Sequence, residues 1–207
     1  LNSNILSMAK VLKNTPKVLG LDISTKTIGW ALFDLMGRNL LELTHVSPKL
    51  KPLPENKLEQ LLLKSESFTT KLKEYQNIGI CRVIIEEPLI NSNNVYTVST
   101  LMRYNAFIIK SIYNVLGVIP DLVSTYNARK YAFPQLVAKN KQNRKVLFGG
   151  YEKGCDKKHI IWQQVSNLEP HLTWEMTRNQ TLKKENYDMA DAYTCVLGYM
   201  KKEEIWD

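Results

Sequence analysis

The order of apolar segments predicts an α/β fold: a mixed five-stranded sheet, an antiparallel meander followed by parallel strands, with helices on both faces. Two observations carry this prediction. Three short apolar segments follow one another with tight turns between them, which is typical of a meander. After them, helix-like segments alternate with short apolar runs, as in parallel strands joined by crossover helices.

The chain has room for one sizeable core. It contains 207 residues, of which 44% are hydrophobic, and this length is too short for two comfortable domains. We therefore expect an N-terminal tail over residues 1–15 and a single domain over residues 16–207.

The first half carries the meander and one helix. The turn segments between its strands contain Ser, Thr, Gly and Asn, which favour turns. Leu and Phe recur at helical spacing after a Pro-rich loop, which predicts a long amphipathic helix. The expected strands are 18–23, 29–34 and 40–46, the loop is 47–54, and the helix is 55–75.

The second half alternates between strand and helix. A continuous apolar run over 80–86 predicts a fully buried strand. A polar loop at 88–94 then leads to a helix over 98–116 that is apolar on more than one face. We further expect a strand at 119–124 and helices at 127–133, where Pro134 ends the helix, at 157–165 and at 186–201.

Composition excludes several classes of protein. No run of about 18 apolar residues occurs, so a membrane span is not expected. Residues 1–13 lack the apolar stretch and cleavage site of a secretory signal, and Met8 offers a natural start. Three cysteines without C-x-x-C spacing, and three scattered histidines, argue against a disulfide framework and against structural zinc. We expect a reducing compartment and no secretion.

Four carboxylates stand where an apolar strand ends or a helix begins: Asp22, Glu86, Asp188 and Asp191. An acid buried at such a place costs several kcal/mol unless something neutralises it. Hard divalent cations take oxygen ligands and are attracted to clustered carboxylates. The sequence therefore predicts a site for a pair of divalent metal ions.

Some of these acids also have a local explanation. Asp22 can close a turn with Ser24, and Asp188 suits a first helical turn because of the helix dipole. Glu86 and Glu87 point to opposite faces of their strand, so only one can reach a shared site. Alternation alone does not choose between them.

The last predicted helix presents its two acids together. Asp188 and Asp191 are three residues apart and share one face. The small residues Cys195 and Gly198 continue this stripe, and we expect them to let the helix approach the sheet closely.

The chain is strongly basic. It has 28 basic and 20 acidic residues, a net charge of +8; with the four acids bound to metal, 16 acidic residues remain and the balance is +12. Such a surface favours a polyanionic partner, the alternative being a merely basic soluble protein. Residues 139–158 have a net charge of +5. This segment is either a mobile loop that binds phosphate backbones or a disordered surface loop. Its basic residues are Lys139, Lys141, Arg144, Lys145, Lys153, Lys157 and Lys158.

Three motifs resemble, in order and spacing, the RuvC family of Holliday-junction resolvases within the RNase H-like nucleases. Leu-Gly-Leu-Asp-Ile-Ser-Thr at 19–25 with Ile-Gly-Trp-Ala at 28–31 is similar to the first motif, a strand turning into a hairpin. Ile-Ile-Glu-Glu at 84–87 resembles the central strand and favours Glu86 over Glu87. Asp-Met-Ala-Asp-Ala at 188–192 resembles the opening of the final helix.

This resemblance implies an RNase H-like fold and a crossover junction endonuclease that hydrolyses phosphodiesters of four-way or branched DNA in recombination and repair. The implied cofactors are two Mg²⁺ ions per active site, for which Mn²⁺ can substitute. One ion activates water and the other stabilises the leaving oxygen. The implied ligands are Asp22, Glu86, Asp188 and Asp191.

The resemblance also implies basic and apolar contacts to DNA. The family's lysine before the last carboxylates is matched best by Lys157, closely followed by Lys158, and Lys130 resembles another basic position. Leu89 and Ile90 stand where the family often has an aromatic wedge, a role that Tyr96 could also fill. The expected DNA contacts are Lys130, Lys139, Lys141, Arg144, Lys145, Lys158, Leu89 and Ile90.

The family acts as a homodimer, because a four-way junction needs two symmetric cuts. The apolar helix over 98–116 is the expected dimer face. Residues 166–185 are longer than the bacterial pattern, which suggests a phage or organellar branch. We expect the protein in the cytoplasm of a bacterial or phage-infected cell, or in an organelle or nucleus if its source is eukaryotic.

Three other functions compete with junction cleavage. The chain could be another RNase H-like nuclease acting on RNA or an RNA–DNA hybrid, although YqgF-like chains are shorter and lack the final Asp-x-Ala-Asp-Ala helix. It could be a non-catalytic DNA-binding module of the same fold, which the intact set of acids opposes. A sugar-kinase or actin fold needs two lobes and about twice this length.

Overall fold

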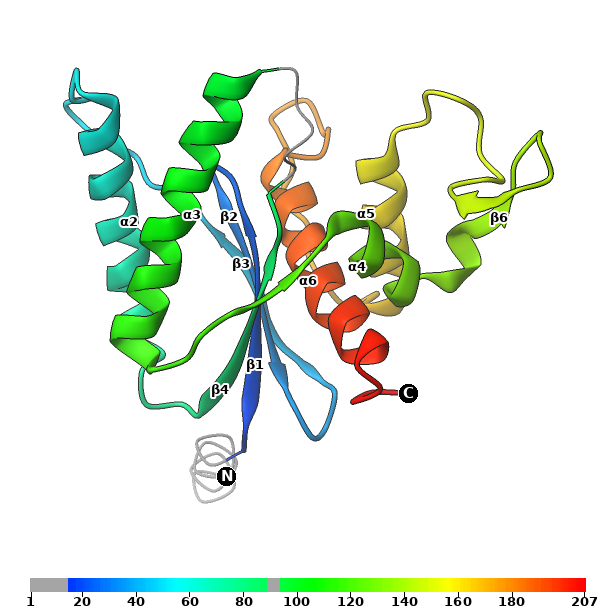
Figure 1. Ribbon diagram of the computed structural model, residues 1–207, viewed down its shortest axis with the longest axis horizontal. Coiled ribbons are helices and arrows are strands. Elements are labelled where there is room, and N and C mark those ends of the chain that lie inside the picture. Colours follow the sequence, from blue (N-terminus) through cyan, green and yellow to red (C-terminus); the bar gives the residue numbers. More distant parts are fainter. Residues whose placement is uncertain (1–14, 89–93) are drawn as a thin grey trace.

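The computed structural model describes residues 15–88 and 94–207 and is built on a five-stranded sheet (Figure 1). The strand order is β3-β2-β1-β4-β5. The N-terminal tail of residues 1–14, Leu89 and Ile90 lie outside the described residues. The strands are β1 (Lys17–Ile23), β2 (Ile28–Asp34), β3 (Leu40–Val46), β4 (Ile80–Glu86) and β5 (Asp121–Val123).

The sheet is mixed, as predicted. The pairs β1–β2 and β2–β3 are antiparallel, and β1–β4 and β4–β5 are parallel. The last strand is shorter than expected from residues 119–124. Pro120 has no N–H to donate, so pairing begins only after it.

Five helices cover the two faces of the sheet (Figure 1). One layer is made by two long helices and the other by three, of which α6 contacts β1, β2 and β4 directly. None of the described helices combines the length and apolar character needed to span a membrane. The first layer is α2 (Lys57–Lys73) and α3 (Val95–Leu116), and the second is α4 (Thr125–Ala132), α5 (Lys157–Leu168) and α6 (Glu185–Lys202).

Strand alternation divides the apolar residues into two cores. On β1, Leu19, Leu21 and Ile23 belong to the core beneath α2 and α3, whereas Val18 belongs to the core beneath α4 and α6. Because side chains alternate along a strand, Asp22 shares the face of Val18 and points toward α6. The same argument places Glu86 on the α6 side.

The first part of the basic segment 139–158 has regular structure, whereas residues 148–156 form turns and irregular backbone. Residues 137–147 form an antiparallel hairpin of β6 (Val137–Lys139) and β7 (Lys145–Leu147). Asn140 holds its turn, since the side-chain oxygen accepts from the backbone N–H groups of Gln142 and Arg144 at 3.0 and 3.1 Å. Asn often bonds nearby backbone groups in this way, so Asn140 is the residue of the sequence that indicates a turn between two strands.

Candidate active site

All four predicted acids line one open cleft. It has a volume of about 360 Å³ and lies where the carboxyl ends of β1 and β4 meet the first turns of α6. Five further polar or charged residues line the cleft with these acids: Ser24, Glu87, Thr125, Arg129 and Lys158. The structure therefore brings together segments that are far apart in the sequence.

The central strand offers the expected acid. Glu86 is half-buried and its Oε1 accepts a hydrogen bond from Thr125 Oγ1 at 2.7 Å. Glu87 is exposed and also lines the cleft, and its backbone N–H donates to Val123 O at 2.8 Å. Glu86 is the more buried of the two, and its choice as a ligand stays a prediction.

Two glycines let α6 come close enough to deliver its acids. A Cβ on Gly20 of β1 would lie 2.4 Å from Ala192 O, and one on Gly29 of β2 would lie 2.0 Å from Asp188 O. Neither space accepts a side chain. The helix backbone therefore rests directly on the sheet at Asp188 and Ala192.

The two small residues of the stripe on α6 have different neighbours. Cys195 is buried with its Sγ 3.8 Å from Glu86 Oε2 of β4, so it faces the sheet as expected, whereas Gly198 does not. A Cβ on Gly198 would lie 2.1 Å from Ala128 O, a backbone atom of α4. Gly198 thus brings α4, rather than the sheet, against α6. This contact matters for the cleft because Arg129 follows Ala128.

Two cations of the chain itself stand among the acids. Arg129 Nη2 lies 2.9 Å from Asp191 Oδ1, and both side chains are nearly buried. Lys158 Nζ lies 3.1 Å from Asp188 Oδ1 and 3.4 Å from Asp191 Oδ2. These contacts offset part of the cost of gathering negative charge in a sparsely hydrated place.

The acids nevertheless destabilise one another's charged forms. Burial, then the charges of Glu86, Asp191 and Asp188, raise the pKa of Asp22 well above its usual value. Burial and the charge of Asp191 also raise the pKa of Glu86, although Thr125, Arg129 and Lys158 oppose this. Burial raises the pKa of Asp188 against the opposing charge of Lys158. A cluster of this kind attracts cations.

The donor set fits a hard divalent ion, although the side chains are not gathered around one point. Among the described residues, no group of three His, Cys, Asp or Glu side chains is placed to hold a metal ion as it stands. All four donors are carboxylates, which Mg²⁺ and Mn²⁺ prefer. The repulsion that raises the pKa of Asp22 is what such an ion relieves.

The predicted lysines take different places. Lys158, which matched the family's lysine second best, lies among the acids of the cleft. Lys157, the best match, lies elsewhere, with its Nζ 5.8 Å from the centre of the Phe148 ring. Adjacent helical residues point about 100° apart, so only one of the pair can face the cleft. Lys130 Nζ lies over the Tyr131 ring, 5.1 Å from its centre.

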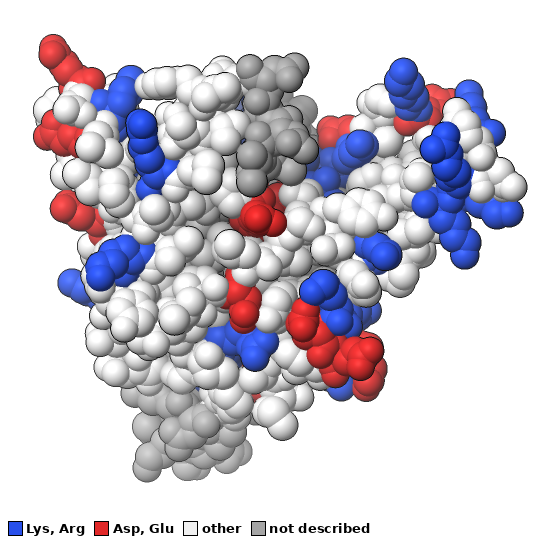
Figure 2. Space-filling model, viewed as in Figure 1, with Lys and Arg blue, Asp and Glu red and all other residues white. Residues whose placement is uncertain are grey.

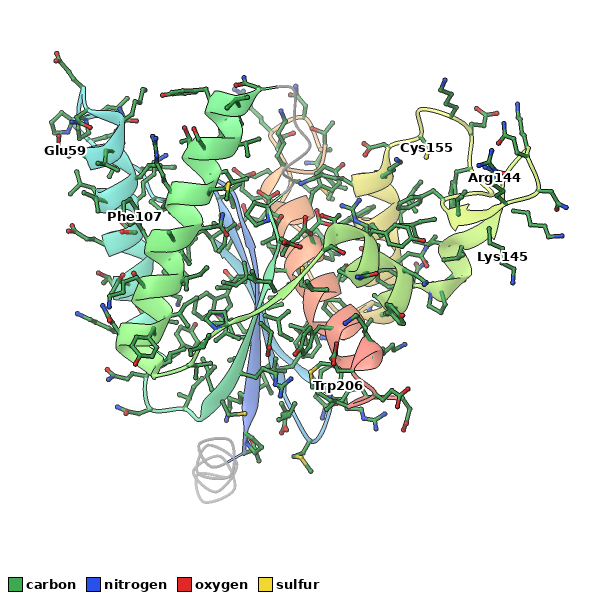
Figure 3. The ribbon with its side chains drawn as sticks, in the orientation of Figure 1. Glu59, Phe107, Arg144, Lys145, Cys155 and Trp206 are labelled. Carbon is green, nitrogen blue, oxygen red and sulfur yellow. The ribbon has the colours of Figure 1, made fainter. Side chains whose placement is uncertain are left out.

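The remaining basic residues gather on the β6–β7 hairpin, as Figure 2 shows. Lys139, Lys141, Arg144 and Lys145 are all exposed, and none has an ion-pair partner within residues 15–88 and 94–207. Arg144 and Lys145 lie at the edge of the molecule away from α2 and α3 (Figure 3). The hairpin thus carries unpaired positive charge outside the cleft, at the edge of the molecule beyond α4 and α5 (Figure 1).

Sequence reasoning missed Thr125 and Arg129. They are four residues apart on α4 and so share one helical face. That spacing was readable, but nothing in the sequence said which face of α4 would turn toward β4. The contact of Gly198 with Ala128 decides it.

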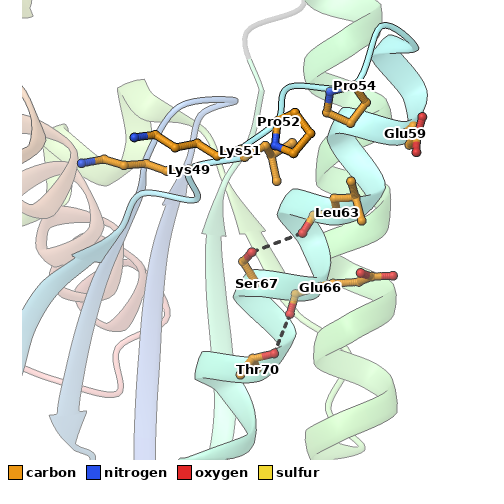
Figure 4. Close-up of a pocket in the computed structure, with 10 residues that line it drawn as sticks. Lys49, Lys51, Pro52, Pro54, Glu59, Leu63, Glu66, Ser67 and Thr70 are labelled. Carbon is orange, nitrogen blue, oxygen red and sulfur yellow. Dashed lines mark hydrogen bonds between the residues drawn. The ribbon is translucent and has the colours of Figure 1, made fainter.

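A larger hollow of about 610 Å³ lies apart from the acids (Figure 4). It runs between residues 49–54 and α2. The hydroxyls of Ser67 and Thr70 donate hydrogen bonds to the backbone carbonyls of Leu63 and Glu66 in the same helix. None of the predicted site residues lines it.

The fold matches solved structures of junction resolvases. Thermus thermophilus RuvC in complex with a Holliday junction substrate superposes with a TM-score of 0.58 at 12% identity, over 92% of this chain and 96% of that one. The yeast mitochondrial Holliday junction resolvase Ydc2 gives 0.60 at 13% identity, over 94% of this chain and 81% of that one. No protein-family model and no characterised protein sequence matches. The chain has the RNase H-like fold of these structures, which confirms the predicted fold.

Proposed function

We propose that this chain is a metal-dependent endonuclease that resolves four-way or branched DNA junctions by paired hydrolysis of phosphodiesters. The observation that carries the proposal is the convergence of Asp22, Glu86, Asp188 and Asp191 in one cleft of a RuvC-type fold. Two solved proteins with this fold are named for Holliday junctions, which supports the choice of substrate.

The four acids would hold two Mg²⁺ or Mn²⁺ ions. Bound there, the ions supply Lewis-acid stabilisation of the attacking and leaving oxygens of an in-line displacement. In the hydrolysis, the oxygen of water forms a bond to phosphorus and gives up a proton to solvent, and one P–O ester bond breaks. The leaving oxygen takes a proton from solvent.

Other residues of the cleft prepare this chemistry. Thr125 orients Glu86 through its 2.7 Å hydrogen bond, and Arg129 holds Asp191 in place. Lys158 is half-exposed at the mouth of the cleft, so its ammonium can leave Asp188 and contact the phosphate that is cut. Charge stabilisation of this kind is commonly the largest contribution to catalysis.

The β6–β7 hairpin would hold the DNA backbone. Its four exposed and unpaired basic residues release counterions when they neutralise phosphates. Contacts of this kind position a duplex without reading its sequence.

Two copies of the chain would act together, because two symmetric cuts need a two-fold arrangement. The outer surface of α3 suits this role. Ile108 and Ile112 are buried against the sheet, whereas Val95, Tyr96 and Met102 are 79%, 63% and 50% exposed. An apolar hollow of about 210 Å³ between α3 and β5 extends the surface. Phe107 is partly buried between α2 and α3 (Figure 3).

The deciding experiment compares four substrates in Mg²⁺: a mobile four-way junction, a plain duplex, an RNA–DNA hybrid and a single strand. Paired symmetric nicks confined to the junction are expected. Equal cutting of the duplex would remove junction selectivity, and cutting of the hybrid alone would favour the RNA-directed alternative. Binding of the junction without any cleavage would favour the non-catalytic DNA-binding module.

A further inference from the structure

A second cleft opens directly from the one that holds the acids. It has a volume of about 410 Å³ and shares Ser24, Lys158 and Asp188 with the first. It continues between the β1–β2 turn, which contributes Lys26, and the residues before α6, which contribute Lys184. If one phosphate of a polymer lies at the acids of the first cleft, the neighbouring part of that polymer can lie in the second cleft.

Lys184 ends the segment 170–184, which has no assigned role, and it is the residue of that segment that lines the second cleft. In Figure 1 this segment, in orange, lies at the end of the molecule where α6 begins. The buried side chain of Asn186 fixes it by bonding both backbone groups of one residue: Oδ1 accepts from Glu175 N at 3.1 Å, and Nδ2 donates to Glu175 O at 2.6 Å.

Further contacts hold the same segment to neighbouring elements. The carboxylate of Glu175 lies between His45 Nε2 on β3, at 3.1 Å, and Lys183 Nζ, at 2.7 Å. Trp174 packs edge-on against Trp162 of α5, with ring centres 5.9 Å apart. These contacts tie the segment that ends in Lys184 to β3, α5 and α6, so the backbone that carries this lysine is held in place.

The second cleft is lined by three lysines, Lys26, Lys158 and Lys184, and by three acids, Asp156, Glu185 and Asp188. Asp156 accepts from His159 N at 3.1 Å, and Asp188 faces Lys158. Lys26 and Lys184 are exposed, and neither has an ion-pair partner in the described part of the chain. These two ammonium groups are therefore open to a negatively charged ligand.

We propose that the second cleft binds the backbone of the substrate strand on one side of the phosphate that is cut, with Lys26 and Lys184 each contacting a phosphate. The inference rests on the proposed function for its polyanionic substrate. It assigns residues 170–184 the task of guiding that strand away from the acids. Lysine suits this task, since it acts as a point charge on a long flexible stem.

The test uses the double substitution Lys26→Ala with Lys184→Ala. Affinity for a fluorescein-labelled mobile junction and for a labelled single strand is measured between about 50 and 200 mM salt. The full chain is used in Ca²⁺, so that binding is followed without relying on cleavage. The matched control is Lys73→Ala with Lys201→Ala, which removes the same charge at the far end of α2 and α6.

Each lost phosphate contact is expected to weaken binding about five- to tenfold and to lower the slope of log affinity against log salt by about 0.7 to 0.9. Replacing single phosphates beside the cleavage position by uncharged methylphosphonates localises the contacts. For the wild type, methylphosphonates at particular positions on one side of the cut should lower the affinity. At those same positions, the double variant should bind the modified and the unmodified probe equally, because it has already lost these contacts.

Several outcomes overturn the inference without touching the proposed function. They are an effect no larger than that of the control pair, or full sensitivity of the double variant to every methylphosphonate. If the wild type binds the probes but cuts none of them in Mg²⁺, the proposed function is wrong. The binding measurements in Ca²⁺ then still decide whether the second cleft holds a strand. Failure of the wild type to bind either probe refutes both.

Discussion

Arg129 Nη2 lies 2.9 Å from Asp191 Oδ1, and the two side chains are only 11% and 3% exposed. The pair joins α4 to α6 inside the cleft of acids. Arg129 is thus a permanent countercharge for an acid that the proposed function assigns to metal binding. Breaking such a pair leaves one charge buried without compensation, which is more costly than removing both.

Replacing this arginine should therefore reveal strong coupling. Arg129→Gln is expected to lower the free energy of unfolding by about 3 to 5 kcal/mol, measured by urea denaturation in EDTA. In an Asp191→Asn background, the same substitution should cost much less, because no uncompensated charge remains. Arg129→Lys keeps the charge and serves as the milder control. Strictly additive losses would contradict the pairing.

The adjacent lysines of α5 offer a matched comparison. Lys158 faces Asp188, whereas Lys157 lies against Phe148. Lys158→Ala should slow single-turnover cleavage about 10²- to 10³-fold, as loss of one charge-stabilising donor does. Lys157→Ala removes an equal charge one residue away and should change the rate only slightly. Equal effects of the two substitutions would mean that the orientation of α5 does not decide the role.

Asp22 is the acid most affected by its neighbours. Asp22→Asn removes one proposed metal ligand while keeping the size of the side chain. Cleavage in Mg²⁺ should fall by at least about 10³-fold, because metal catalysis supplies several kcal/mol, and junction binding should remain intact. Gel shifts in Ca²⁺ and single-turnover rates in Mg²⁺ separate the two effects. Loss of binding to the same degree as cleavage would contradict the metal-site assignment.

The raised pKa values of Asp22, Glu86 and Asp188 predict how stability depends on pH. A carboxyl whose pKa is raised by folding binds protons more tightly in the native state. Its contribution is therefore fully present below the unfolded pKa of about 4 and is lost as the pH rises through the folded pKa. In EDTA, the wild type should lose stability relative to Asp22→Asn as the pH rises, and Mg²⁺ should reduce the loss. Parallel urea midpoints for the two proteins across the pH range would argue against repulsion among the acids.

Gly29 controls the distance between β2 and α6. Gly29→Ala places a methyl group 2.0 Å from Asp188 O, so the start of the helix must move away from the sheet. We expect a loss of about 1 to 3 kcal/mol in stability and about a 10²-fold slower cleavage from the displaced acid. Gly150→Ala is the control, since its Cβ would meet only Ala138 Cβ at an ordinary 3.7 Å. Full activity of Gly29→Ala would show that Asp188 need not lie so close to the sheet.

The sequence by itself determined the order of strands and helices and the faces of the strand-borne acids. Alternation places Asp22 opposite Leu21 and Ile23, and Glu86 opposite Ile85, so each acid reaches the α6 face once its strand is buried. The three-residue spacing likewise places Asp188 and Asp191 on one side of a helix. These are consequences of backbone periodicity, which needs no knowledge of neighbouring elements.

Only the tertiary structure decided which helix faces meet the acids. The rotation of α5 and α4 about their axes depends on packing. Ile161 and Val165 form part of the buried face of α5, and the backbone of α4 at Ala128 packs against Gly198 of α6. That packing chooses Lys158 over Lys157 and brings Arg129 onto Asp191. Periodicity fixes which residues share a face of a helix, but contacts with other elements fix where that face points.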